Sequence, residues 1–206
     1  MKTNDERMQD ILKYLESLDH IRPENIPDID LYMDQVTTFM DEHLKDTKRH
    51  PEDKVLTKTM INNYAKNNLL PAPNKKKYSK EHMLLLIFIY YFKNLLSFHD
   101  IEQLFRPITE KHFNSAEEIP LEDIYKEVFS QVEKNIDRIK VDITQKYQHT
   151  SKTFEDKGLE EDDLEYLRLF TWICELSFDV YIKKQIIEQI IDDLRESEPV
   201  SMKKKK

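Results

Sequence analysis

The chain has 206 residues, 39% of them apolar and 35% charged, so it can bury the core of one domain or of two small ones. Its single glycine, Gly158, excludes P-loops, dinucleotide-binding fingerprints and kinase phosphate loops, because each of these motifs needs several glycines. The formal net charge of −8 argues by itself against a nucleic-acid binder, and the single cysteine, Cys174, excludes an internal disulfide.

Helical periodicity begins at residues 5–18, which predict an amphipathic helix with one apolar face: Met8, Ile11, Leu12, Leu15 and Leu18. Two prolines in residues 21–30 predict a linker. A second helix is predicted over residues 31–44 from its apolar positions: Leu31, Val36, Phe39, Met40 and Leu44. Residues 45–54 contain a proline and no apolar side chain, which indicates a connecting loop.

A short helix follows over residues 57–67, with Thr57 as its N-cap. At 100° per residue, its apolar face carries Met60, Ile61 and Tyr64, so Tyr64 is expected in the core. The opposite face is polar and cationic, with Lys58, Thr59, Asn62, Asn63 and Lys66. Asn68 falls where the helix should end, at a position that favours a left-handed conformation.

Pro71 and Pro73 then forbid helix and predict an extended arm or small hairpin that carries Lys75, Lys76 and Lys77. Residues 45–93 contain 11 Lys and Arg against 4 Asp and Glu, an excess of 7 positive charges; the rest of the chain contains 21 against 36. This asymmetry indicates a basic module joined to an acidic one, although a solvated face formed by chance would give the same pattern.

Ser79 is the predicted cap of the next helix, whose run at residues 83–92 is apolar nearly all round and predicts the central core helix. Ser97 and Asp100 predict the start of one more short helix, with His99 in its first turn, followed by a loop near residues 107–119. Pro120 opens a long helix, Gly158 lies in a polar break, and a last helix is predicted over residues 161–195. These two long helices can pair as a hairpin.

Several of these segments resemble the MerR family of regulators. MINNYAKNNLL, residues 60–70, aligns without gaps with the family's recognition-helix pattern TIRYYEREGLL, and KYSKEH, residues 77–82, matches the entry to the following helix. The apolar helix and LSFHDIEQLF, residues 96–105, look like the family's next two helices. Tyr64 and Lys66 match the pattern, whereas Asn62, Asn63 and Asn68 stand where the family has Arg, Tyr and Gly.

A closer resemblance comes from DLYMDQVTTF, residues 30–39, together with LTKTMINNY, residues 56–64. They are similar to an uncharacterised bacterial family, common in Firmicutes, that is described only as a domain of unknown function with a MerR-like helix-turn-helix. The resemblance covers residues 24–106 and implies a winged helix-turn-helix with a short extended or hairpin wing. Together with the periodicity, it predicts an all-α fold in which a C-terminal helical hairpin follows the winged domain.

The predicted organisation is an N-terminal helix and linker at residues 1–23, the winged helix-turn-helix domain at 24–106, a helical domain at 107–195 and a basic, mobile tail at 196–206. The resemblance implies a DNA-binding transcriptional regulator, with residues 57–67 in the major groove and the lysine-rich wing on the phosphate backbone. The DNA-binding residues expected from these segments are Lys58, Thr59, Asn62, Asn63, Lys66, Lys75, Lys76 and Lys77.

The alternative is a helical interaction or adaptor protein that uses the helix-turn-helix only as a scaffold, which the overall negative charge favours. No enzyme, cofactor or metal site is expected, because the seven histidines lack HExxH or paired metal-ligand spacing and no reactive constellation stands out. The single cysteine and the absence of a long apolar run or signal-peptide pattern indicate a cytoplasmic protein that does not enter a membrane.

The last helix is expected to form the partner surface. Cys174 lies among apolar residues, where a buried and inert thiol is expected. The aromatic side chains around it predict a core or the interface of a homodimer, and a small-molecule pocket between the helices is a further possibility: Tyr166, Phe170, Trp172, Phe178 and Tyr181. Double-stranded DNA and a second copy of the chain are the expected partners.

Overall fold

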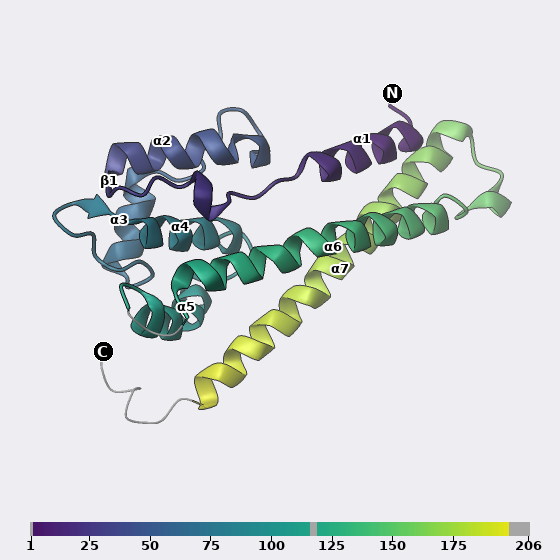
Figure 1. Cartoon of the computed structure of the whole chain (residues 1–206). Helices are drawn as coiled ribbons and strands as arrows, with labels where there is room; N and C mark the ends of the chain where they lie inside the picture. Colours follow the sequence, from purple (N-terminus) through teal and green to yellow (C-terminus); the bar gives the residue numbers. More distant parts are fainter. Residues whose placement is uncertain (1, 116–118, 198–206) are drawn as a thin grey trace. The chain divides into compact units, whose positions relative to one another are not determined.

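The computed structural model describes residues 2–115 and 119–197 (Figure 1). Helices account for 72% of the chain, and the sheet of the described residues has two short strands, so the protein is mostly helical as predicted. Contacts divide the described chain into two units. The first unit combines the chain up to His20 with Phe129–Ile186, and the second combines Ile21–Val128 with the chain from Ile187 onward.

The second unit contains most of the short elements, in this order: η1 (Pro23–Asn25), β1 (Leu31–Tyr32), α2 (Met33–Leu44), η2 (Lys45–Thr47), α3 (Lys58–Lys66), β2 (Lys77–Tyr78), α4 (Lys80–Phe92) and α5 (Phe98–His112). Two longer helices, α6 (Leu121–Thr150) and α7 (Glu161–Ser197), each belong to both units. Helix α4 buries eight consecutive residues, His82 to Ile89, which confirms it as the core helix. Tyr125 of α6 is fully buried in this unit and donates a hydrogen bond of 2.5 Å to the carbonyl oxygen of Ile21.

Two predicted boundaries were wrong. Leu31 and Tyr32 are not helical but form β1, because they pair antiparallel with Tyr78 and Lys77 of β2 and so satisfy backbone groups outside a helix. The loop expected from residue 107 begins later, since α5 continues through Pro107 to His112. The buried side chains of Ile101 and Phe105 hold this helix on the core, and that packing outweighs the backbone hydrogen bond that proline cannot make.

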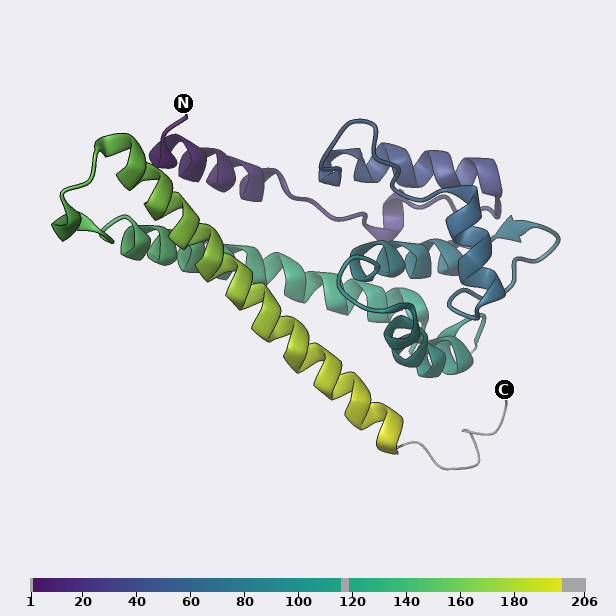
Figure 2. The same ribbon diagram turned by 180° about the vertical axis from the view of Figure 1, so that it is seen from behind.

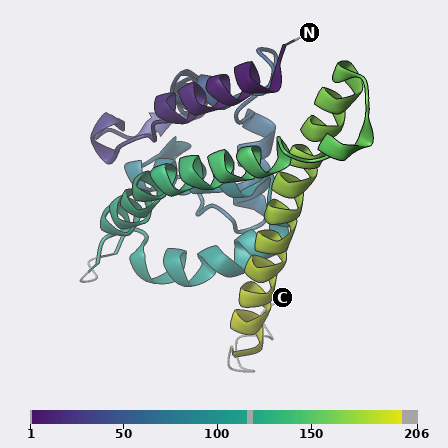
Figure 3. The same ribbon diagram turned by 90° about the vertical axis from the view of Figure 1, so that its right-hand side faces the viewer.

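The first unit contains α1 (Asn4–Ser17), α6 from Phe129, η3 (Glu155–Lys157) and α7 up to Ile186. Figures 2 and 3 show α6 and α7 joined at one end by residues 151–160. Phe154 and Gly158 both have positive φ in this connection, so the single glycine stands at one of its two left-handed positions. Lys146 of α6 bonds Asp179 of α7 at 2.9 Å, which supports the predicted hairpin of long helices.

Helix α1 is held to this unit by polar contacts at its start. The backbone amide of Asn4 donates to the Glu165 carboxylate at 3.2 Å, and the Asn4 side chain donates to the Glu165 carbonyl oxygen at 2.9 Å. The Tyr147 hydroxyl donates to Asp5 at 2.5 Å. The basic tail predicted over residues 196–206 lies outside the described residues except for residues 196 and 197, which belong to α7.

His82 is the third residue of helix α4, a position that glutamate or glutamine usually holds in a capping box. The Ser79 backbone N–H donates to Nδ1 of His82 at 3.0 Å, which closes the capping box around the helix start. This bond requires Nδ1 to be unprotonated. Burial of the ring lowers the pKa of His82, although the negative charge of Asp30 acts in the opposite direction.

We expect acid to destabilise the second unit through His82. The unfolded chain, with a histidine pKa of about 6.5, binds the proton more readily than the folded chain. The stability conferred by neutral His82 is therefore complete above about pH 6.5 and is lost as the pH falls below that value. His82→Gln keeps a hydrogen-bond acceptor for Ser79 but cannot be protonated. In thermal denaturation between pH 7.5 and pH 5, the wild type should lose about 2–4 °C more than the variant. Parallel pH profiles for the two proteins would contradict this role.

Candidate nucleic-acid interface

Helix α3 is formed by signals at both of its ends. The Met60 backbone N–H donates to Oγ1 of Thr57 at 3.2 Å, so Thr57 is the N-cap as predicted. Asn68 has φ of 61°, which confirms the expected left-handed position after the helix. Because the chain turns there, the amides of Leu69 and Leu70 both reach back to the carbonyl oxygen of Tyr64, at 2.9 and 3.3 Å.

The two faces of α3 differ as the sequence predicts. Ile61 and Tyr64 are buried, with 0% and 6% of their surface exposed. The five polar residues of the opposite face are all exposed: Lys58, Thr59, Asn62, Asn63 and Lys66. The helix therefore presents amides and ammonium groups to solvent while its apolar side holds it on the core.

The lysine-rich segment after α3 forms a hairpin. Asn74 and Lys77 pair as an antiparallel bridge, and the Lys77 N–H donates to the Asn74 carbonyl oxygen at 2.9 Å. The two residues between them, Lys75 and Lys76, have φ of 49° and 64°. Positive φ at both central residues is typical of a type I′ turn, which usually takes Asn-Gly. Both lysines are exposed, so the turn places two positive charges at its tip.

Helix α3 and this hairpin meet the same short segment of chain. Lys58, in the first turn of α3, forms an ion pair with Asp34 of α2. Lys77 of β2 lies over the ring of Tyr32, with its Nζ 5.2 Å from the ring centroid. Since Tyr32 and Asp34 are two residues apart, one end of α3 and the base of the hairpin flank the start of α2. Lys58 is thus held by a carboxylate on the protein itself.

Other lysines of the basic stretch at residues 45–93 take part in internal contacts. Lys48 pairs with Asp41 at 2.6 Å, and Lys80 lies 3.3 Å from Asp28 and 3.1 Å from Glu122. The Lys93 ammonium donates to the Val55 carbonyl oxygen at 2.7 Å, and burial lowers the pKa of Lys93. These side chains stabilise the second unit, so the charge excess of the stretch overstates the number of cations open to a ligand.

Two other residues considered in the sequence analysis, Asp100 and Cys174, lie outside α3 and the hairpin. Asp100 stands in the first turn of α5, where it accepts from Ser97 and lies 3.6 Å from Arg195 of α7. Cys174 is half-buried, so the prediction of a buried thiol was wrong; Ile173 and Phe178, among which it lies, are exposed.

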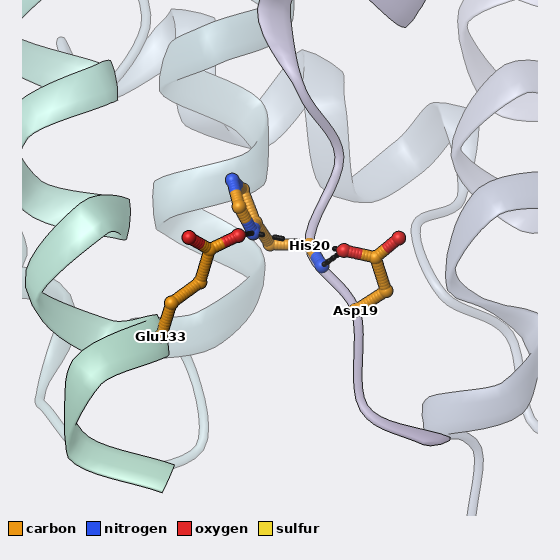
Figure 4. Close-up of side chains that lie close together, drawn as sticks. All are labelled: Asp19, His20 and Glu133. Atoms are coloured by element: carbon orange, nitrogen blue, oxygen red, sulfur yellow. Dashed lines mark hydrogen bonds and ion pairs between the residues drawn. The ribbon is translucent and has the colours of Figure 1, made fainter. Parts of the chain in front are cut away.

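The fold also brings together three residues that the sequence did not connect. Nδ1 of His20 lies 3.2 Å from the Glu133 carboxylate and 3.8 Å from that of Asp19 (Figure 4). The His20 ring stacks on Phe129, with centroids 5.0 Å apart, which fixes its orientation. Imidazole and carboxylates are metal ligands, but Asp19 already accepts the His20 backbone N–H at 2.8 Å and both carboxylates are exposed. An ion pair between His20 and Glu133 accounts for this geometry.

These features define a mostly helical protein whose second unit contains a short helix with an exposed polar face and a hairpin with two lysines at its tip. The chain belongs to the family described as Domain of unknown function (DUF1836), whose model matches residues 21–128, just over half of the 206 residues. No curated protein and no solved structure matches it. None of the helices among the described residues combines the length and the apolar character needed to cross a membrane.

We expect the backbone of the hairpin tip to be strained, because two lysines occupy positions that normally favour glycine or asparagine. A left-handed conformation costs about 1–2 kcal/mol for a residue with a side chain, and two adjacent lysines adopt it here. The double substitution Lys75→Asn and Lys76→Gly should therefore raise the free energy of unfolding by about 1–2 kcal/mol, measured by urea denaturation. Lys75→Ala with Lys76→Ala removes the same charges without relieving the backbone, so it should give no such gain. Equal stability of the two variants would show that φ is not the cause.

Proposed function

We propose that the protein is a DNA-binding transcriptional regulator whose recognition helix is α3 and whose wing is the hairpin around Lys75 and Lys76. The observation that supports this most directly is the division of α3 into a buried apolar face and an exposed face of lysines and amides. In this proposal α2, α3, the hairpin and α4 correspond to a MerR-like winged helix-turn-helix. The order of these elements agrees with that motif.

The chemistry of the exposed groups suits duplex DNA. In the major groove an asparagine side chain can bind adenine through two hydrogen bonds: its NH2 group donates to N7 and its carbonyl oxygen accepts from the N6 amino group, which is the role proposed for Asn62 and Asn63. Lysine ammonium groups neutralise phosphates, which is the role proposed for Lys66 on the helix and for the hairpin tip. Asparagine replaces the arginine of the MerR pattern at position 62, so phosphate contact depends on the lysines.

The exposed apolar side chains of α7 support a homodimer. Tyr166, Ile173, Val180 and Ile187 recur every seven residues, and each is at least 39% exposed. A seven-residue apolar repeat is the pattern of helices that pair along a seam. A dimer would present two copies of α3 to half-sites about one helical turn apart, which is how helix-turn-helix dimers read DNA.

The second candidate is an adaptor that binds another protein through α7. The same exposed residues support it, together with Phe178 and Tyr181, which are 65% and 58% exposed. Aromatic side chains in such positions are typical of protein interfaces. In that case α3 and the hairpin would form a scaffold with no ligand of their own.

DNA binding is tested by selecting motifs from a pool of random duplexes and by measuring affinity at several salt concentrations. We expect a motif to be enriched by the wild type. The triple variant of Lys66, Lys75 and Lys76 to alanine should reduce the slope of log affinity against log salt by about 3, because each phosphate contact contributes about 0.9. Asn62→Ala should change the selected motif and leave the slope intact.

A matched control removes three exposed lysines from the first unit, Lys134, Lys152 and Lys157, and so makes the same change in net charge. Its salt slope should equal that of the wild type. If the control loses as much affinity as the α3 and hairpin variant, binding depends on net charge alone and α3 is not the DNA-recognition helix. If the wild type selects no motif and binds only weakly at low salt, the adaptor becomes the better proposal.

The dimer is tested by sedimentation equilibrium. We expect the wild type to have twice the mass of the chain at micromolar concentration, and the double variant Ile173→Glu with Val180→Glu to have the mass of one chain, because a buried glutamate costs several kcal/mol at an apolar seam. Val132→Glu with Val141→Glu places the same two charges on exposed positions of α6 and should leave the dimer intact. A wild-type monomer would remove this part of the proposal.

A further inference from the structure

The first unit contains a cavity of about 410 Å³ between the start of α1, the end of α6 and the start of α7. It is lined by Asn4, Asp5, Tyr147, Thr150, Ser151, Glu161, Leu164, Glu165, Arg168 and Trp172. The volume lies within the range of about 300–1,000 Å³ that small-molecule sites occupy. All of the lining residues belong to one unit, so the cavity is built by elements that pack directly on each other.

Three carboxylates line this cavity, and their charges are not balanced within the described part of the chain. Glu165 accepts from Asn4, and Asp5 accepts from the neutral hydroxyl of Tyr147. Among the described residues, none of Asp5, Glu161 and Glu165 forms an ion pair with a lysine, arginine or histidine. The one cation in the lining, Arg168, is directed elsewhere: its Nε donates to the Thr153 carbonyl oxygen at 3.1 Å and its guanidinium lies 3.8 Å from Glu155.

A second and independent feature is a buried donor without an acceptor. Trp172 is 3% exposed, and its Nε1 has no hydrogen-bond partner among the described residues. A buried N–H left unpaired costs about 1–3 kcal/mol, so native structures rarely keep one without a reason. The indole ring packs on the ring of Tyr147, with centroids 5.0 Å apart, and both residues line the cavity.

The positions of the carboxylates distinguish an organic cation from a metal ion. A bound metal ion needs its ligand atoms within about 2.0–2.6 Å of one point. Among the described residues, the single group of three potential ligands whose atoms lie within 4.8 Å of one another is Asp19, His20 and Glu133, away from this lining. The carboxylate oxygens of Asp5, Glu161 and Glu165 thus do not form such a group, and a larger cation suits them better than a metal ion does.

We propose that this cavity binds a small organic cation that also carries a hydrogen-bond acceptor. Its ammonium group contacts the carboxylates of Asp5, Glu161 and Glu165, and its acceptor, a hydroxyl or carbonyl oxygen, takes the N–H of Trp172. The site gives the protein a small-molecule ligand in addition to its proposed DNA target, and it does not depend on DNA binding.

The test is isothermal titration calorimetry of the full chain, without DNA, with choline, ethanolamine and agmatine as probes. We expect saturable binding of at least one probe at one site per chain. For a choline response, 3,3-dimethylbutan-1-ol, which has the same shape without the charge, should not bind. Glu161→Gln should weaken binding about tenfold or more, as should Glu165→Gln, because each removes a negative charge from the cavity lining. Trp172→Phe, which keeps a ring and removes the N–H, should weaken it severalfold.

Asp163→Asn is the matched control, since it removes an exposed carboxylate from the same helix outside the lining. It should bind the probe as the wild type does. The Glu161 side chain is exposed and forms no hydrogen bond with any described residue, so Glu161→Gln remains informative even if Glu165→Gln melts early. The proposal is overturned if no probe saturates up to about 10 mM, if Glu161→Gln and Trp172→Phe bind like the wild type, or if calcium chloride alone displaces the probe. None of these outcomes bears on whether α3 contacts DNA.

Discussion

Helix α4 buries eight consecutive residues from His82 to Ile89, and a helix can do so only if other elements cover every side of it. The rest of the second unit follows from this requirement. The β1–β2 ladder, α3, α5 and the start of α6 supply apolar side chains around it, including Ile61, Phe105 and Tyr125, which are all buried. Because α3 gives its apolar face to this core, its polar face must point to solvent. The surface proposed to meet DNA is thus a consequence of core packing.

Scarcity of glycine is the second constraint on this chain. Left-handed backbone positions normally fall to glycine, yet the sequence has one, at Gly158. The remaining left-handed positions of the described residues are held by residues with side chains: Asn68, Lys75, Lys76, Asn114 and Phe154. Asparagine tolerates this conformation, whereas lysine does so at a cost in stability. The two lysines of the hairpin tip therefore lower stability, and the proposed phosphate contact would favour lysine there in spite of that cost.

Local sequence signals made helix α3 and its two faces predictable. Thr57 and Asn68 mark the ends of α3 by capping chemistry, and the 3.6-residue period separates its buried and exposed faces, so the five proposed contact residues on α3 follow from local positions. The sequence could not predict β1, because its two residues join a ladder with Lys77 and Tyr78, and strand pairing across 45 residues leaves no local pattern. The ion pair of His20 with Glu133 and the cavity at Trp172 escaped prediction for the same reason, since each joins residues that are distant in the sequence.

The charges close to α3 bear more directly on DNA binding than the net charge of the whole chain does. At physiological ionic strength, charges beyond about 8 Å are largely screened, so a phosphate at α3 responds to nearby lysines and little to the acidic remainder of the chain. The local balance is nonetheless narrow, because Asp34 pairs with Lys58 and internal contacts hold Lys48, Lys80 and Lys93. With few free cations, non-specific affinity for DNA should be low, and a useful affinity would require two copies of α3 bound at once. The two parts of the proposal therefore support each other, because a dimer formed through the apolar repeat of α7 would compensate for the modest charge of each α3.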